Sequence, residues 1–248
     1  MELSHRLETL LSLVTPGETA ADIGTDHGYI PIELVSRGIC RRAIGVDVRE
    51  GPLARARSHV ERQGLGGQVS LRLGDGLAPV SSGEADRILI AGMGGPLMRR
   101  ILAETPETAH AAGELILSPQ SEAGAFRRFL RENRYRIEEE ALVEEEGKYY
   151  PVLRVIPSEM SEEIPAAECD LYGDPAVLRP QDLPVLQAFL EREWEVWTEV
   201  RRHLEDQRSG TAIARLAEVE ERIDRIRRAR QAAGSGPVEA EEKTGGSL

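Results

Sequence analysis

The chain has 248 residues, enough for one sizeable α/β domain and a smaller unit, and 40% of them are hydrophobic, as in an ordinary globular protein. Its apolar runs are too short to cross a bilayer, and its first residues lack the pattern of a secretory leader. Two distant cysteines, Cys40 and Cys169, suggest neither a disulfide framework nor a cysteine metal site. We therefore expect a cytoplasmic protein with no metal and no membrane partner, with a monomer favoured.

The charge distribution is uneven along the chain. A net charge of −12 disfavours a phosphate-rich partner, because phosphates attract cations. Residues 137–175, however, contain 12 acidic and 2 basic side chains, whereas residues 1–136 contain 17 of each. A basic face outside the acidic segment therefore stays open as a binding surface for nucleic acid.

Short apolar segments alternate with amphipathic segments up to residue 157. The apolar segments predict strands at 20–24, 42–48, 68–76, 85–95 and 113–120. The amphipathic segments predict helices at 1–14, 30–38, 51–64, 96–105 and 122–135. This alternation predicts an α/β fold with a parallel sheet covered on both faces. Residues 136–157 are predicted to form a hairpin that turns near Gly147 and adds two antiparallel strands at one edge.

The C-terminal part has a different pattern. Apolar residues recur at spacings of three and four in two runs, which are separated by Gly210, a predicted helix stop. The first run is Leu186, Leu190, Trp194, Trp197, Val200 and Leu204, and the second is Ile213, Leu216, Val219, Ile223 and Ile226. Two such helices predict an antiparallel hairpin of the coiled-coil type. The expected organisation is an α/β domain at 1–157, a linker at 158–180, the helical hairpin at 181–231 and a disordered tail at 232–248.

Polar residues and glycines follow four consecutive predicted strands. In a parallel sheet these carboxyl ends meet at one edge, where ligands bind near the point at which strand order reverses. The residues concerned come from "DIGTDHG", "GVDV", "GDG" and "AGMGG": Asp22, Gly24, Asp26, His27 and Gly28, then Asp47, then Asp75 and Gly76, then Gly92, Met93, Gly94 and Gly95.

The acidic side chains at these ends indicate the kind of cofactor. Asp47 lies at the distance after Gly24 at which a carboxylate meets a ribose diol, which NAD and S-adenosylmethionine both carry. Asp22 and Asp26 would repel a pyrophosphate but attract a sulfonium and an ammonium group, by about a few kcal/mol at an effective dielectric constant near 20. We therefore predict S-adenosylmethionine, with Asp75 accepting the adenine amino group.

Six motifs between residues 2 and 156 resemble the bacterial TrmK family. They are "LSHRLETLLSLV", "ADIGTDHGYIP", "REGPLARA", "LRLGDGL", "IAGMGGPLM" and "EEGKYYPVLRV". Members of that family are S-adenosylmethionine-dependent methyltransferases that modify N1 of adenine 22 in tRNA. The resemblance implies a Rossmann-like class I methyltransferase domain at 1–157 and a C-terminal coiled-coil domain. The polar-Pro-Pro-aromatic motif of many amino-methylating enzymes is absent at "AGMGG", which argues against methylation of the exocyclic amine.

The resemblance also implies roles for particular residues. The expected cofactor-binding residues are Asp22, Gly24, Asp26, His27, Gly28, Asp47, Val48, Asp75, Gly76, Gly92 and Met93. Asp26 and Gln120 are the catalytic candidates, although this chain has "LSPQ" where "LQPN" is expected, so Gln120 replaces an Asn. Asp26 would favour the cation that forms on the base, or serve the cofactor alone.

Substrate contacts are predicted around the fourth strand end and on basic helices. Glycine backbone leaves room for a base that has been flipped out, since adenine N1 lies on the Watson–Crick edge. The expected substrate-binding residues are Arg6, Tyr29, Gly94, Gly95, Pro119, Arg127 and Arg131. Tyr29 is equally consistent with a packed core residue, and Arg128 and Arg134 belong to the same basic group as Arg127. Arginines of the helical hairpin would grip the tRNA body, or else serve packing or oligomerisation.

Three alternatives remain open from the sequence. The same cofactor would serve a methyltransferase of small molecules or proteins, against which the large helical arm argues. A non-catalytic RNA-binding protein on the same fold is disfavoured by Asp22, Asp47 and Asp75. An NAD oxidoreductase is the least favoured, because of the charges in the first turn.

Overall fold

A mixed seven-stranded sheet forms the centre of the protein in the computed structural model, which describes residues 3–158, 171–205 and 210–234, without side chains for 210–214. The sheet has the order β3-β2-β1-β4-β5-β7-β6. Its strands are β1 (Gly17–Ile23), β2 (Cys40–Asp47), β3 (Val69–Leu73), β4 (Arg87–Met93), β5 (Glu114–Pro119), β6 (Tyr135–Glu145) and β7 (Lys148–Pro157). The first five strands are parallel, and β7 is antiparallel to both β5 and β6. The predicted fold class, with an antiparallel hairpin at one edge, is confirmed.

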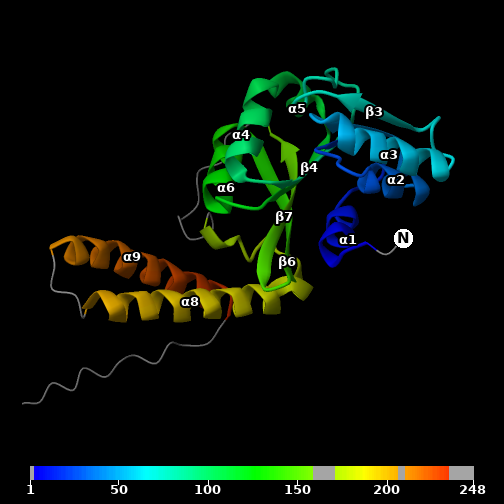
Figure 1. The fold of residues 1–248 in the computed structure, drawn as a ribbon. Coiled ribbons are helices and arrows are strands. Elements are labelled where there is room, and N and C mark those ends of the chain that lie inside the picture. The colour runs from blue at the N-terminus through cyan, green and yellow to red at the C-terminus, as the bar shows by residue number, and fades with distance from the viewer. Residues whose placement is uncertain (1–2, 159–170, 206–209, 235–248) are drawn as a thin grey trace, which may run out of the picture.

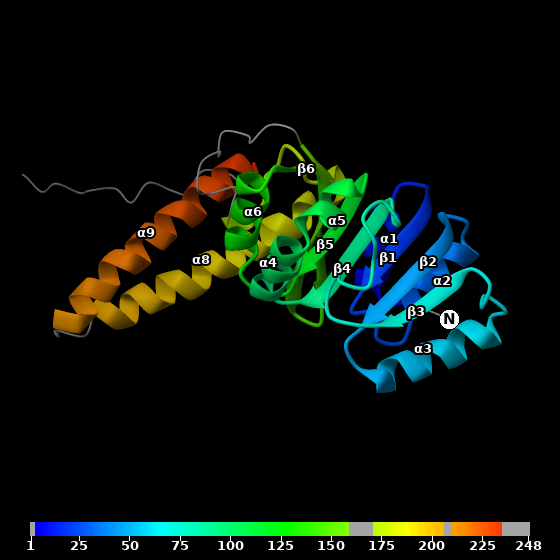
Figure 2. The ribbon, with the colours of Figure 1, turned by 90° about the horizontal axis from the view of Figure 1, so that it is seen from above.

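Helices cover both faces of this sheet (Figures 1 and 2). They are α1 (His5–Ser12), α2 (Tyr29–Ser36), α3 (Glu50–Arg62), α4 (Gly95–Glu104), α5 (Pro106–Ala111) and α6 (Ala123–Glu132). Alternate side chains of β4 point to opposite faces of the sheet. Ile88 and Ile90 pack with α4, α5 and α6, whereas Leu89 packs with α1 and α2. Burial on both faces explains why this strand reads as a continuous apolar run.

Two long helices extend away from the sheet side by side (Figure 1). A short 3-10 turn, η1 (Pro180–Asp182), leads into α8 (Leu183–Glu205), which packs against α9 (Gly210–Ala232). Leu186 and Leu190 of α8 and Ile226 of α9 are buried in one cluster. The predicted helical hairpin is therefore confirmed, but Gly210 begins the second helix and is not the stop of the first.

The hairpin is attached to the sheet through the segment that precedes it. The backbone N–H of Glu140 in β6 donates to the Val177 carbonyl at 2.8 Å, and the Arg179 N–H donates to the Glu140 carbonyl at 2.8 Å. The Asp182 carboxylate accepts a hydrogen bond from the Leu142 N–H at 3.2 Å. Leu178 thus forms an isolated bridge with Glu140 at the edge of the sheet, although it falls within the expected linker. Residues 159–170 of that linker, and 235–248 of the expected tail, lie outside the described residues.

No helix in the described ranges has the length and apolar character needed to span a bilayer.

Candidate cofactor and substrate site

A cavity of about 840 Å³ lies at the carboxyl ends of β1, β2 and β4. Strand order reverses here: β2 and β3 lie on one side of β1, whereas β4 and β5 lie on its other side. Ligands of doubly wound sheets bind at this point. The predicted site residues that line the cavity are Arg6, Asp22, Gly24, Asp26, His27, Tyr29, Asp47, Val48, Asp75, Gly76, Gly92, Met93 and Gln120.

Asp47 ends β2 at the floor of the cavity and is only 5% exposed. One of its carboxylate oxygens accepts the Asp26 N–H at 3.2 Å, and the other accepts the Arg49 N–H at 2.9 Å. Two backbone hydrogen bonds fix the orientation of the carboxylate. Each oxygen keeps a second lone pair, so the group fits a pair of neighbouring hydroxyls such as a ribose diol.

Asp22 lies near the end of β1, 6% exposed, beside Asp47. Burial raises the pKa of Asp22 to about 7 and outweighs the Thr25 side chain, which lowers it, while the Asp47 carboxylate adds to the rise. An ionised carboxylate is therefore costly here in the free protein. A cationic ligand would favour ionisation, so this end of the cavity fits a positively charged group.

The first turn holds Asp26 in a left-handed backbone conformation, with φ of 48°. Its carboxylate is half exposed on the cavity wall and lies 3.3 Å from the His27 Nε2. The same turn contains Gly24, where a Cβ atom would lie 2.4 Å from the Met93 Cε. The Met93 methyl group can move aside, so the requirement for glycine comes from the backbone of this position, which has a left-handed φ of 78°.

Asp75 has a partner that the sequence did not predict. Its two carboxylate oxygens accept hydrogen bonds from Arg100 of α4, at 3.1 and 3.2 Å. Arg100 also lines the cavity and pairs with Glu104 at 3.0 Å. Nothing in the local sequence indicates this pair, because α4 returns to the third strand end only in the folded chain. An adenine amino group would have to share the Asp75 carboxylate with Arg100 or displace it.

Gln120 and Arg6 meet at the mouth of the cavity. In the amide orientation that satisfies both of its ends, Gln120 accepts a hydrogen bond from the Arg6 guanidinium at 3.0 Å and donates one to the Gly92 carbonyl at 3.3 Å. The Arg6 guanidinium also lies over the ring of Tyr150, 4.8 Å from its centroid. The catalytic candidate Gln120 is therefore held beside the fourth strand end. Pro119 is buried next to it and does not line the cavity.

Three of the predicted glycines have a packing role outside the cavity. A Cβ atom on Gly95 would lie 2.7 Å from the Ser121 carbonyl oxygen, and one on Gly94 would lie 2.8 Å from the Ser121 Oγ. Gly28 begins α2 with φ of 74°, and a Cβ atom there would meet Ala56 of α3 at 3.0 Å. Packing against Ser121 and Ala56 is thus a sufficient reason for glycine at these positions, and the contact of Gly94 and Gly95 with a base stays a prediction.

Arg127 and Arg131 also lie apart from the cavity. They are 3% and 6% exposed, on the side of α6 that faces β6. Arg127 pairs with the buried carboxylate of Glu140. Burial raises the pKa of Glu140, and both arginines oppose the rise. This burial argues against the predicted phosphate contacts, because a guanidinium enclosed with a carboxylate does not reach an RNA backbone. Arg128 and Arg134 are exposed.

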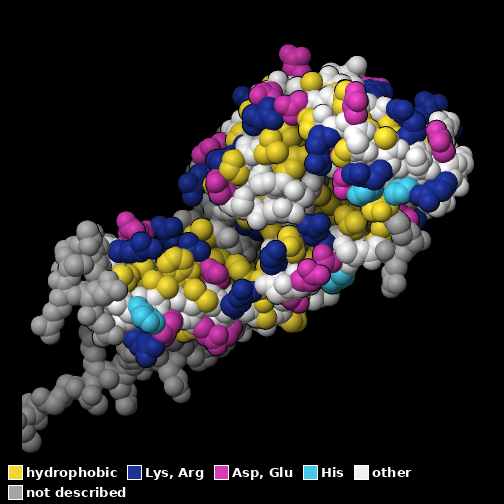
Figure 3. Space-filling model, in the orientation of Figure 1, with side chains coloured by type: hydrophobic (Ala, Val, Ile, Leu, Met, Phe, Trp, Pro, Cys, Tyr) yellow, Lys and Arg dark blue, Asp and Glu magenta, His cyan; other side chains and the backbone are white. Residues whose placement is uncertain are grey.

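Arginines of the helical hairpin are also paired with acidic residues. These pairs are Arg222 with Glu193, Arg225 with Glu221, Arg227 with Asp224, and Arg230 with Glu191. Arg222 and Arg230 additionally lie over the rings of Trp197 and Trp194. Figure 3 shows hydrophobic and charged side chains interleaved along this arm. Such pairing reduces the net positive charge that the arm offers to phosphates.

Comparison with known proteins identifies the family. Residues 3–153 match the family model described as a methyltransferase domain. The tRNA (adenine(22)-N(1))-methyltransferase of Bacillus subtilis (strain 168) is 40% identical over 153 residues, which span 62% of this chain and 64% of that relative, less than two thirds of its length.

Solved structures extend the likeness to the helical hairpin. The crystal structure of Streptococcus pneumoniae Sp1610, a putative tRNA (m1A22) methyltransferase in complex with S-adenosyl-L-methionine, is 31% identical, with a TM-score of 0.75 over 92% of this chain and 99% of that one. The crystal structure of the B. subtilis m1A22 tRNA methyltransferase TrmK is 29% identical, with a TM-score of 0.79 over 92% of this chain and 98% of that one. The chain belongs to the methyltransferase-domain family and, within it, to the TrmK group.

Proposed function

We propose that this protein transfers the methyl group of S-adenosyl-L-methionine to N1 of adenine 22 in tRNA. The observation that carries the proposal is the cavity that the buried carboxylates of Asp22 and Asp47 line together with Gln120 and Arg6. Two relatives support it: one is named as an enzyme of this activity, and another was crystallised with this cofactor.

The cavity wall offers a partner for each part of the cofactor. Asp47 would accept the two ribose hydroxyls, and Asp22 would face the cationic methionine end. Two large hydrophobic side chains exposed on the wall, Val48 at 57% and Leu97 at 39%, would cover the adenine ring. Asp75 and Gly76 would meet the adenine edge at the third strand end.

The transfer needs positioning more than acid–base catalysis. When bound, S-adenosyl-L-methionine supplies an electrophilic methyl group, and the neutral adenine N1 already holds the lone pair that attacks it. The base becomes cationic, and the Asp26 carboxylate on the cavity wall would stabilise that charge. Gln120, held by Arg6 and Gly92, would fix the edge of the base beside Met93.

The target base has to leave its stack to reach this cavity. Tyr29, which lines the cavity next to the first turn, would stack on the extruded base. In this proposal residues 1–157 carry out the transfer in the cytoplasm, and the hairpin at 181–231 positions the rest of the tRNA.

The test is incubation of the protein with labelled cofactor and unmodified tRNA transcripts, followed by mapping of the methylated nucleotide. The matched control is a transcript in which adenine 22 is replaced by guanine. We expect label at N1 of adenine 22 and none in the control. Label on N6, on another molecule or on no tRNA would contradict the substrate assignment, and protein that binds tRNA without transferring label would be a binding protein only.

A further inference from the structure

A second cavity lies next to the first, between α2 and α3. It has a volume of about 440 Å³ and is lined by Tyr29, Ile32, Glu33, Ser36, His59, Arg62 and Gln63. Tyr29 lines both cavities, so they are separated by little more than one side chain. None of the residues of α3 in this wall has a role in the proposed cofactor site.

Three aromatic rings cluster along this boundary, and the ring centroids of His27 and His59 are 6.1 Å apart with an interplanar angle of 25°. The ring centroids of His27 and Tyr29 are 5.5 Å apart with an interplanar angle of 21°, and those of Tyr29 and His59 are 5.4 Å apart at 11°. A contact of 3.0 Å between the His59 Nδ1 and the His27 carbonyl oxygen fixes the His59 ring. All three rings are partly exposed. Aromatic rings at the surface are the kind of platform on which the bases of a single strand stack.

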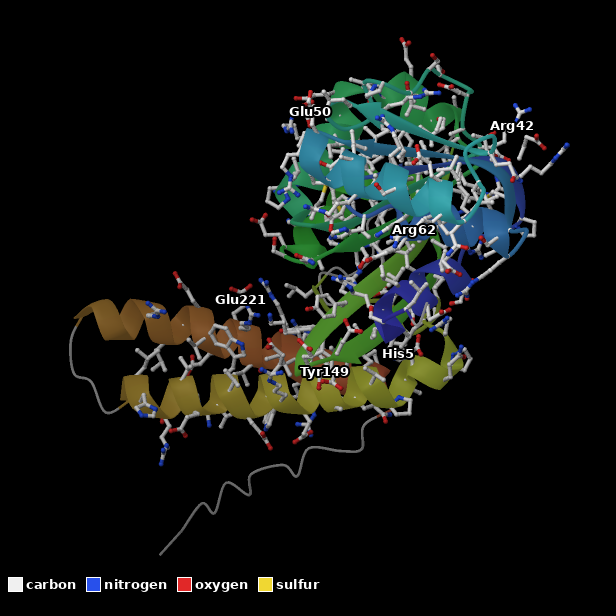
Figure 4. The ribbon with its side chains drawn as sticks, turned by 45° about the vertical axis from the view of Figure 1, so that its right-hand side comes forward. His5, Arg42, Glu50, Arg62, Tyr149 and Glu221 are labelled. Carbon is white, nitrogen blue, oxygen red and sulfur yellow. The ribbon has the colours of Figure 1, made fainter. Side chains whose placement is uncertain are left out.

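The outer face of α3 is basic beside these rings. Arg55, Arg57 and Arg62 are exposed, against two exposed glutamates, Glu50 and Glu61. Figure 4 shows Glu50 and Arg62 at opposite ends of the helix, and Figure 3 shows histidines next to basic side chains over this part of the surface.

The arginines of this face differ from those of the hairpin. Among the described residues no carboxylate pairs with Arg55 or Arg62, and the Arg62 Nε donates instead to the Ser58 carbonyl at 3.3 Å. The one acidic residue of the cavity, Glu33, is paired with Arg37 at 2.8 Å. These guanidinium groups therefore keep their charge available for a phosphate.

We propose that the second cavity binds a nucleotide that neighbours the methylated adenosine in the tRNA. Its base would stack on His59, and its phosphate would contact Arg62 and Arg55. The inference rests on the proposed function, because an adenosine turned into the first cavity stays joined to its neighbours, and Tyr29 is where the two cavities meet. Unstacked bases on rings beside arginines are a common form of single-strand RNA recognition.

The experiment compares the double variant Arg55→Ala/Arg62→Ala with Arg42→Ala. Arg42 is also an exposed arginine, near the start of β2, and lines neither cavity (Figure 4). Affinity for tRNA is measured by fluorescence anisotropy at several salt concentrations, and cofactor affinity by calorimetry. We expect the double variant to raise the Kd for tRNA about tenfold or more and to reduce the salt slope by about one to two, with cofactor affinity unchanged. Arg42→Ala should change neither.

The ring is tested separately with His59→Ala and His59→Phe. Loss of one stacking surface should raise the Kd for tRNA about tenfold, and phenylalanine should restore most of the affinity. If Arg55→Ala/Arg62→Ala and His59→Ala bind tRNA as tightly as Arg42→Ala does, the inference is overturned, while the proposed methyltransferase function is unaffected. Failure of the native protein to methylate any tRNA would instead overturn the function, and the anisotropy data would still decide whether RNA contacts α3.

Discussion

The Asp47 carboxylate accepts the backbone N–H of Asp26 at 3.2 Å, so the end of β2 fixes the turn that follows β1. This contact makes Asp47 both a support of the turn and the proposed ribose ligand. Asp47→Asn keeps the size of the side chain and one oxygen, but loses the charge and one acceptor.

We expect Asp47→Asn to weaken cofactor binding about tenfold to hundredfold, because hydrogen bonds to a charged group contribute about 1.5–3 kcal/mol. Calorimetric titration with S-adenosyl-L-methionine measures this effect. Glu18→Gln, at the opposite end of β1 and paired with Arg41 at 3.5 Å, is the matched control. Equal affinities of the two variants would show that the ribose lies elsewhere.

Because of Asp22, the stability of the protein and its affinity for the cofactor should change in opposite directions as the pH rises. Its pKa is raised from 3.8 to about 7 in the folded protein, so the ionised form costs folding free energy. The contribution of the Asp22 carboxyl to the free energy of unfolding is greatest below pH 4. It is lost progressively as the pH rises to 7, by at most about 4 kcal/mol. Asp22→Asn should therefore raise the Tm at pH 8 and leave it unchanged at pH 4.

Cofactor binding should show the opposite trend with pH. A cationic ligand favours the ionised carboxylate, so the affinity of the native protein should rise from pH 6 to pH 8. Asp22→Asn should bind more weakly at pH 8 and lose this dependence. Calorimetry at three pH values is the measurement. A native affinity that is independent of pH would mean that Asp22 does not face the positive charge.

Gln120 and Arg6 should act as one unit. Gln120→Ala removes the link between Arg6 and Gly92, and we expect kcat for tRNA methylation to fall about tenfold with cofactor affinity retained. Arg6→Ala should have a similar effect, and the double variant should lose little more than either single variant, because both break the same contact. Additive losses would show that the two residues act independently.

Gly95 should be intolerant of any side chain. A Cβ atom there would lie 2.7 Å from the Ser121 carbonyl oxygen, which cannot move without its backbone, so we expect Gly95→Ala to destabilise the fold by about 1–3 kcal/mol. Gly94→Ala meets the Ser121 Oγ, which can rotate away, and should cost less. Urea denaturation measures both. Equal losses would mean that the β4–α4 and β5–α6 turns shift together.

The sequence predicted the sheet and the place of the cavity for a local reason. Alternating strand and helix patterns leave few ways to build an α/β sheet, and parallel strands bring all their carboxyl ends to one edge. The acidic residues at three strand ends, Asp22, Asp47 and Asp75, were therefore expected to converge, and they line one cavity. The heptad-like spacing after residue 181 predicted the helical hairpin in the same way.

Only the tertiary structure decided which side chains are free to act. The periodicity of α6 places Arg127 and Arg131 on one face of the helix. That this face is buried, and that Arg127 pairs there with Glu140 of β6, follows only from the packing of the folded chain. In the same way Arg100 reaches Asp75, Arg6 reaches Gln120, and His59 stacks on Tyr29. Local sequence fixes backbone propensity and periodicity, whereas charge pairing and burial depend on segments that meet only when the chain folds.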